Sequence, residues 1–325
     1  MFFIISPSHN AYYNMAMEEK YFGIQANEFL ILWQNENAIV VGKYQNTAEE
    51  VNSSYVEENG IAVVRRLSGG GAMYQDLGNV NYTFIVNRAD TELNFDLFTK
   101  IVIDALRNLG VPAEASGRND ITINGKKISG SSQFSKGGRV LHHGTLLFDS
   151  NLDVLDKALH AQAGKLESKG IKSVRARVDN IRPYLAKDME TSEFIEYISE
   201  YLINKHSLIE LDIDYPEEQA IHRLANEKYS TWEWVYGQSP PYTVQRERKF
   251  SGGTITAYLV VKNGIIQSVE LRGDFFASEN VEQLCSELVG VADNRLSVHQ
   301  ALASSPYGNS IYNVSIEELA DLLGS

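Results

Sequence analysis

The sequence IAVVRRLSGGGAMY, residues 61–74, joins a strand-like run to two arginines and a glycine-rich loop. Four apolar residues lead directly into Arg65 and Arg66, and three glycines follow at 69–71. Glycine allows positive φ and lets a ligand approach closely, because it has no Cβ. An arginine beside such a loop offers a planar set of donors to phosphate or carboxylate. The pattern favours a strand that feeds a loop for a nucleotide or an acyl phosphate. A tight turn with two surface arginines is the alternative interpretation.

The glycine-rich loop matches neither of two common phosphate-binding motifs. It is not a Walker A loop, because no Gly-Lys-Ser or Gly-Lys-Thr follows at the required spacing. It is not the G-x-G-x-x-G fingerprint of dinucleotide-binding folds either. Other segments of the chain must therefore decide between the two interpretations.

Composition narrows the class of protein. The chain has 325 residues, 43% of them hydrophobic, which is enough for a large core or two domains. The formal net charge of −13 argues against nonspecific nucleic-acid binding but leaves room for a local basic pocket. Cys285 is the only cysteine, so no internal disulfide is possible. The N-terminus does not resemble a signal peptide, and no apolar run approaches the ~18 residues of a membrane span. We expect a cytoplasmic protein that binds neither nucleic acid nor membranes.

Hydrophobic periodicity predicts intermixed helices and strands over the first 230 residues. We expect helices over 10–26, from 47 to before 60, and over 94–109, 151–159 and 191–205. We expect strands over 29–33, 38–42, 61–66, 80–87 and 139–148, and a hairpin over 121–128 with Asn124-Gly125 at its turn. Several turns are too short for a helical crossover. The predicted fold class is therefore α+β, with mixed, mainly antiparallel sheets and flanking helices.

The pattern changes near residues 232–245, where Pro240-Pro241 favours an extended connector. Three strand-like runs follow at 242–250, 253–262 and 265–273, and then helices at 278–289 and near 297–303. This tail is long enough for a small α+β domain. We predict a catalytic domain over residues 1–240 and a C-terminal accessory domain over residues 241–325.

Asp120 and Lys127 lie on opposite sides of the predicted Asn124-Gly125 turn, so their side chains could point into one site. A lysine beside a phosphate and a carboxylate oxygen would stabilise the charge that builds up during attack at phosphorus. The aspartate could bind Mg²⁺ or a ribose hydroxyl. An exposed ion pair of little energetic value is the alternative.

Two further segments contain candidate ligands. His142 and His143 are adjacent on a predicted strand, so at most one of them can face a site, and a two-histidine metal site is disfavoured. The segment 169–180 carries four basic residues in an otherwise acidic chain. It is either a solvated loop or a docking surface for an acidic partner.

Taken together, these segments resemble the lipoate–protein ligases of the single-chain, two-domain type over nearly the whole chain. The resemblance rests on ordered motifs at 65–72 with 76–79, 117–120, 127–130, 142–147 and 169–175. Residues 13–19 and 33–35 upstream, and 232–240 downstream, are also similar to the family.

The resemblance implies a fold like that of biotin and lipoate ligases and a two-step reaction that consumes ATP. Lipoate would be activated to lipoyl-AMP, and the lipoyl group would pass to a lysine of a carrier. The carriers would be 2-oxoacid dehydrogenase E2 subunits and the glycine cleavage H protein. Lys127 would be catalytic, and Asp120 would lie next to the adenylate, with Mg²⁺ as a possible partner. The implied ligands of ATP and lipoyl-adenylate are Arg66, Ser68, Gly69, Gly70, Gly71, Ala72, Met73, Tyr74, Asp120, Lys127 and His143.

Two positions depart from the family pattern. Gln75 precedes Asp76 where the family usually has histidine, and glutamine cannot titrate near neutral pH. If that histidine only positions a loop, the replacement changes little. If it assists proton transfer or carrier recognition, activity would be reduced. Ala176 stands where serine is common.

Three rival functions remain at this stage. An ATP-independent transferase would move lipoyl or octanoyl groups between carriers through a cysteine, but Cys285 lies on an apolar helix stripe with Val281, Leu284 and Leu288. A biotin ligase would have its glycine and arginine residues in a different order. A non-catalytic lipoate- or adenylate-binding protein is the third alternative.

Overall fold

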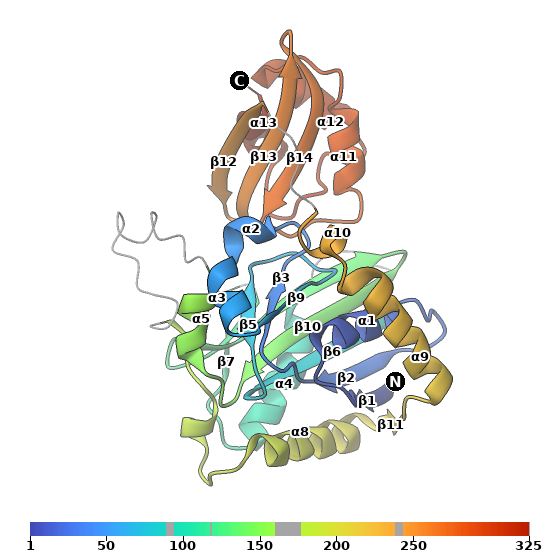
Figure 1. The fold of residues 1–325 in the computed structure, drawn as a ribbon, viewed down its shortest axis with the longest axis vertical. Helices are drawn as coiled ribbons and strands as arrows, with labels where there is room; N and C mark the ends of the chain where they lie inside the picture. Colours follow the sequence, from blue (N-terminus) through green and yellow to red (C-terminus); the bar gives the residue numbers. More distant parts are fainter. Residues whose placement is uncertain (89–93, 118, 160–176, 238–242, 325) are drawn as a thin grey trace. The chain divides into compact units, whose positions relative to one another are not determined.

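The structure is a computed structural model that describes residues 1–88, 94–117, 119–159, 177–237 and 243–324. Its contacts divide the chain into two compact units (Figure 1). The first unit comprises Met1–Val41, Ala48–Arg66 and Met73–Val235, and the second comprises Gly42–Thr47, Leu67–Ala72 and Tyr236–Ser325. Each unit is described by itself. Among the described residues, every helix is too short or too polar to cross a membrane.

Within the described residues, the first unit is built on an eight-stranded sheet of mixed direction. Its spatial order is β11 (Ile209–Glu210), β1 (Phe2–Ile5), β2 (Phe29–Trp33), β6 (Asn79–Asn87), β10 (Arg139–Leu147), β9 (Lys126–Lys136), β8 (Asp120–Ile123) and β7 (Glu114–Ser116). β1 is parallel to both of its neighbours, and every other neighbouring pair is antiparallel. The predicted mixed, mainly antiparallel α+β class is confirmed.

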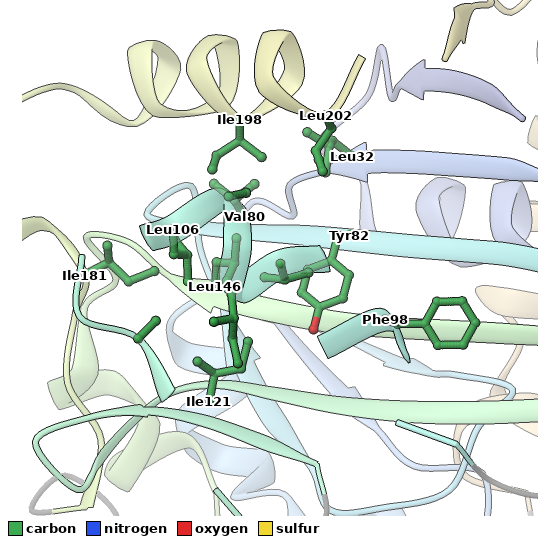
Figure 2. Close-up of a cluster of buried hydrophobic side chains, with 14 of the residues drawn as sticks. Leu32, Val80, Tyr82, Phe98, Leu106, Ile121, Leu146, Ile181, Ile198 and Leu202 are labelled. Atoms are coloured by element: carbon green, nitrogen blue, oxygen red, sulfur yellow. The ribbon is translucent and has the colours of Figure 1, made fainter. Parts of the chain in front are cut away.

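One face of this sheet is covered by α4 (Asp96–Asn108) and α8 (Thr191–His206). Figure 2 shows the core between them and the strands, where Ile198 and Leu202 of α8 lie near Val80 and Leu32. Apolar residues at alternate strand positions point to this face, because side chains alternate across a β-strand. Gly110 adopts φ 87° just after α4, as expected for a glycine that ends a helix.

The opposite face packs against α1 (Ala11–Phe22), α9 (Tyr215–Leu224) and the π-helical turn η2 (Ala225–Tyr229). Asn10 caps α1, since its side chain accepts a hydrogen bond from the Tyr13 backbone N–H at 3.0 Å. A second, three-stranded sheet contributes to the same core in the order β4 (Ala62–Arg65), β3 (Ala38–Val41), β5 (Met73–Gln75). This small sheet leads the chain into and out of the glycine-rich loop.

Several predicted boundaries differ from the structure. The strands predicted at 29–33 and 38–42 are present, but β2 and β3 belong to different sheets. The helix predicted from residue 47 is two short helices, α2 (Thr47–Glu50) and α3 (Ser53–Glu58), because Asn52 caps the second. The first unit also contains α5 (Leu152–Ala158), the 3-10 turn η1 (Arg182–Tyr184) and α10 (Trp232–Val235). The strands β1, β5, β7 and β11 and the helices α9, α10 and α13 were not predicted from the sequence.

The second unit contains a three-stranded antiparallel sheet of β12 (Val244–Phe250), β13 (Gly253–Lys262) and β14 (Ile265–Gly273). The turn between β13 and β14 has Asn263 at φ 53° and Gly264 at φ 73°, which suits an Asn-Gly hairpin. The helices α11 (Val281–Glu287), α12 (Arg295–Ser304) and α13 (Ile316–Leu323) pack on this sheet. The predicted β-then-α tail is present, while the functional roles assigned to residues 1–240 and 241–325 stay predictions.

Three predicted features lie outside the described residues. They are the Pro240-Pro241 connector, Arg118, and residues 169–176 of the basic segment.

Candidate active site

A pocket opens within the first unit. The lining combines apolar side chains with a few hydrogen-bonding groups, which is typical of small-molecule sites. The lining residues are Met15, Trp33, Val40, Arg66, Met73, Gln75, Asn81, Gly130, Ser132, His143, Gly144 and Thr145.

Strand pairing explains how β9 and β10 form one wall. His143 of β10 lies directly opposite Ser132 of β9 in the antiparallel register. Gly130 is two residues before Ser132, so both positions lie on the same face of β9. All three residues line the pocket.

His142 and His143 face opposite sides of the sheet, as strand alternation predicts. The His142 ring stacks on Phe98 with 4.6 Å between ring centroids, and its Nδ1 lies 2.9 Å from Gln133 Nε2. Burial, and then the neighbouring His143, lower the pKa of His142 well below its ordinary value of 6.5. His142 is therefore a neutral core residue, and His143 is the histidine that lines the pocket.

The two arginines at the end of β4 have different tasks. Arg65 donates from Nε to the Trp234 carbonyl at 2.9 Å and from Nη2 to the Val235 carbonyl at 2.8 Å. Trp234 returns a bond from its indole N–H to the Arg65 carbonyl at 2.9 Å. Arg65 thus fixes α10 to β4, whereas Arg66 lines the pocket. Burial lowers the pKa of Arg66 to about 10, so it still carries a positive charge at neutral pH.

Lys127 and Asp120 form an ion pair, with 2.8 Å between Lys127 Nζ and Asp120 Oδ1. Both side chains are partly exposed, so the pair adds little stability. Its position is more informative. A Cβ on Gly130 would lie 2.7 Å from Lys127 Nζ and 3.8 Å from Asp120 Oδ1. Because Gly130 and Ser132 share a face of β9, the ammonium group lies over the pocket side of that strand.

The backbone of Lys127 is held by the segment that follows the basic run. The Asp179 N–H donates to the Lys127 carbonyl at 2.9 Å. The Asp179 carboxylate accepts from Lys126 Nζ and from the Tyr184 hydroxyl, both at 2.9 Å. Burial alone would raise the pKa of Asp179, but these bonds hold it below its ordinary value. Asp179 therefore stays ionised and anchors the start of β9.

The glycine-rich loop, Ser68–Ala72, belongs to the second unit. Gly70 has φ 88° and donates its N–H to the Phe275 carbonyl at 3.3 Å. A Cβ on Gly69 would lie 2.3 Å from that same oxygen. The Lys43 N–H donates to the Ser68 carbonyl at 2.8 Å. Two of the three glycines are therefore required by backbone packing inside this unit.

Met73 and Tyr74 follow the loop in β5, and alternation separates their side chains. Met73 lines the pocket, whereas the Tyr74 hydroxyl donates to Asn37 Oδ1 at 3.1 Å and its side chain is not among the pocket residues. The ligand contact predicted for Tyr74 therefore stays a prediction about its backbone.

Gln75 occupies the pocket wall within a network of buried amides. Its side-chain oxygen accepts from Asn35 Nδ2 at 2.8 Å, and its Nε2 donates to Asn81 Oδ1 at 2.8 Å. Asn35 in turn accepts from Asn14 Nδ2 at 2.9 Å. The Gln75 side chain is thus fully engaged in neutral hydrogen bonds.

Sequence reasoning named Arg66, Met73 and His143 as ligands, and all three line the pocket. Met15, Trp33 and Gly130 lie in segments that are similar to the family but were not named as ligands, and Val40, Asn81 and Ser132 lie in none of these segments. Glu18, which contacts His143, is 1% exposed on α1. The sequence gives only a weak indication of this role, because Glu18 is a charged residue among the apolar residues of a helix.

Comparison with known families gives two matches. Residues 10–203 match the lipoyl protein ligase A/B catalytic domain, and residues 239–323 match the bacterial lipoate protein ligase C-terminus. Among curated proteins, the chain is similar to Lipoate-protein ligase LplJ of Bacillus subtilis (strain 168). The two are 42% identical over 300 residues, which is 91% of each chain.

Solved structures show the same fold. P. falciparum LipL1 in complex with lipoate superposes with a TM-score of 0.79 at 24% identity, covering 98% of this chain and 97% of that one. A lipoate-protein ligase A bound with ATP has a TM-score of 0.63 at 26% identity, covering 73% of this chain and 99% of that one.

Proposed function

Because the chain belongs to the lipoate–protein ligase family, we propose that it activates lipoate with ATP and transfers the lipoyl group to carrier proteins. The observation that carries this proposal is the placement of Lys127 over Gly130, on the pocket face of β9. A buried arginine in the wall and an ammonium group beside it suit an anion attached to an apolar chain.

In the first step, the carboxylate of lipoate attacks the α-phosphate of ATP, and pyrophosphate leaves. Negative charge builds up on the α-phosphate oxygens during this attack. In this proposal, the Lys127 ammonium and the Arg66 guanidinium would stabilise that charge. The backbone of Gly71, Ala72, Met73 and Tyr74 would hold the nucleotide, and the Ser68–Gly70 loop would line the channel for the dithiolane. His143 would contact the adenylate from β10.

Asp120 fits a role in holding Mg²⁺, since it is a partly exposed carboxylate beside the proposed phosphate position. The described residues contain no cluster of three metal-ligating His, Cys, Asp or Glu side chains. Magnesium in nucleotide sites often needs only one or two carboxylates together with substrate phosphates. The ion would neutralise phosphate charge, and Asp120 would orient Lys127 through the 2.8 Å ion pair.

In the second step, the amine of a carrier lysine attacks the acyl carbon of lipoyl-AMP. An amide forms, the amine gives up a proton, and AMP leaves. We propose the lipoyl domains of E2 subunits and the glycine cleavage H protein as acceptors, because the family resemblance implies them.

The rival transferase would need a reactive cysteine. Burial is the main cause that raises the pKa of Cys285, to about 12, so its thiol stays protonated at neutral pH. Cys285 packs against the core of the second unit. This environment favours ATP-dependent activation over covalent thioacyl transfer.

The experiment that tests the function is pyrophosphate release from ATP by the purified protein, without a carrier. Lipoate, octanoate and biotin are offered in turn. We expect release with lipoate, less with octanoate and none with biotin. Absence of release with all three acids would reject the activation step.

A Lys127→Ala variant tests the proposed catalytic residue. We expect lipoyl-AMP formation to fall by about a hundredfold or more, because the variant loses a charge aimed at the transition state. Lys126→Ala is the matched control, since Lys126 pairs with Asp179 instead. The rate of lipoyl-AMP formation is measured for both, with circular dichroism to check folding. Equal rates for the two variants would remove Lys127 from the mechanism.

A further inference from the structure

Glu18 is a buried carboxylate that the proposed mechanism does not use. It lies on α1 and is 1% exposed. Its Oε1 accepts a hydrogen bond from the Thr83 hydroxyl at 2.5 Å. His143 Nδ1 lies 2.9 Å from Oε1 and 3.1 Å from Oε2. A charged side chain is expensive to bury unless it is paired, so its retention here needs an explanation.

Glu18 acts only as an acceptor in the hydrogen bonds around it. The Trp33 indole N–H donates to Thr83 Oγ1 at 2.9 Å, and the Thr83 hydroxyl then donates to Glu18. An ionised carboxylate only accepts hydrogen bonds, so the contact with His143 places a proton on Nδ1 of that ring. Trp33 and His143 both line the pocket. One carboxylate therefore orients two parts of the wall.

Glu18 also acts on the charge of the pocket. Its carboxylate raises the pKa of Arg66, opposing the lowering caused by burial. The same charge is one of the causes, after burial and Glu19, that raise the pKa of Tyr229. Among the described residues, Arg66 just after β4, His143 of β10 and Tyr229 of η2 are thus titratable groups that interact with Glu18.

We propose that Glu18 is a positioning residue of the active site, which fixes the Nδ1–H form of His143 and the orientation of Trp33 for an anionic acyl substrate. The inference deepens the proposed function and rests on it for the identity of that substrate. The hydrogen-bond arrangement itself does not depend on any substrate.

The first test reads the proton on His143 directly. Protein labelled with 15N-histidine is examined by NMR at pH 8, and a His143→Asn variant assigns the signal. We expect the proton on Nδ1 in the unaltered protein. The Glu18→Gln amide can donate to Nδ1 as well as accept from it, so the Nε2–H form should gain population. A proton on Nε2 in the unaltered protein, or the same tautomer populations in both proteins, would overturn the proposal.

The second test measures pyrophosphate release kinetics. We expect Glu18→Gln to raise the KM for lipoate about ten- to hundredfold, the range for losing one or two charged hydrogen bonds. Glu19→Gln is the matched control on the same helix, because Glu19 bonds to Lys228 and Tyr229. It should stay within about twofold of the unaltered protein. Equal KM values for the two variants would contradict the proposal.

A second variant covers the case in which Glu18→Gln fails to fold. Thr83→Val keeps the side-chain shape but removes the link between Trp33 and Glu18. We expect a higher KM for lipoate with the His143 tautomer unchanged, and an unaltered KM would overturn the role of the link. If the unaltered protein releases no pyrophosphate but shows the Nδ1–H tautomer, the proposed function fails while the role of Glu18 in the pocket stands.

Discussion

Gly130 has no side chain, and the Lys127 ammonium occupies the space that a Cβ would need. An alanine Cβ there would come within 2.7 Å of Nζ and 2.8 Å of Cε. The lysine can move aside because its end is flexible, so the fold should tolerate the change. The position of the ammonium group would shift, and misplacement by about 1 Å can cost a hundredfold in rate.

We therefore expect Gly130→Ala to keep its melting temperature within a few degrees but to lose about ten- to hundredfold in lipoyl-AMP formation. Single-turnover kinetics measure the rate, and calorimetry measures the melting temperature. A variant that activates lipoate normally would show that the placement of Nζ over Gly130 does not matter.

Gln75 permits a test by pH, because an imidazole at this position would be buried among neutral amides. Burial disfavours the charged form of histidine and lowers its pKa in the folded state. The unfolded state would then bind more protons below about pH 6.5, so the stability of Gln75→His should fall, relative to the unaltered protein, as pH decreases.

Urea unfolding at pH 5.5, 6.5 and 7.5 measures this difference for Gln75→His and the unaltered protein. A gap in the free energy of unfolding that stays constant over this range would contradict the expectation. Activity measured over the same range shows whether the titratable residue also changes catalysis.

At the scale of elements, local signals were sufficient for much of the fold. The helices predicted over 10–26 and 94–109 are present as α1 and α4, and the Asn124-Gly125 turn appears where the sequence predicted it. The helix α13 was missed although Ser315 and Glu318 form a capping box before an apolar run. By contrast, β1 and β11 are four and two residues long, and their pairing is set by neighbours far along the chain. Such short strands carry too little periodicity to be predicted.

The glycine-rich loop offers a matched pair of substitutions. A Cβ on Gly69 would meet the Phe275 carbonyl oxygen at 2.3 Å, while one on Gly71 has nothing within 4 Å. Because the neighbour of Gly69 is backbone, it cannot move aside easily. We expect Gly69→Ala to destabilise the second unit by about 1–3 kcal/mol and Gly71→Ala to change its stability by less than about 0.5 kcal/mol.

Hydrogen exchange of β13 and β14 amides measures the stability of that unit. Equal protection in the two variants would show that the loop does not pack on Phe275 in solution.

At the scale of the whole molecule, family and fold were predictable because five motifs occur in a fixed order. The complete pocket wall was not, because it is formed by residues of α1, β2, β3, β5, β6, β9 and β10. Their assembly depends on the register of antiparallel pairs and on alternation across the strands. His142 and His143 illustrate what could and could not be predicted. Strand alternation predicted that they lie on opposite faces, but it did not predict which of them contacts Glu18.

Both units contain buried groups that would release a proton only at high pH. Burial, as the main cause, raises the pKa of Tyr13 and Tyr82 in the first unit, and of Cys285 in the second, to about 12 in each case. Because the tyrosines keep their protons more tightly in the folded state, they add to the free energy of unfolding. This contribution is complete below pH ~10, the pKa of tyrosine in an unfolded chain, and is lost as pH rises toward about 12.

We therefore expect the free energy of unfolding in urea to fall steeply between about pH 10 and 12. Tyrosinate absorbance should rise together with the loss of structure. Tyr82→Phe removes one of these groups and should lessen the slope. A flat profile across this range would contradict the expected ionisation.

The second unit joins two early loops, Gly42–Thr47 and Leu67–Ala72, to a segment that begins at Tyr236. On the ribosome, roughly 160 residues must be added between them, which takes about ten to thirty seconds at ordinary rates of translation. During that interval Gly69 and Gly70 have emerged, but Phe275 has not yet been synthesised. The glycine-rich loop is translated within the first quarter of the chain, but it is thus among the last parts of the nascent chain to reach its native conformation.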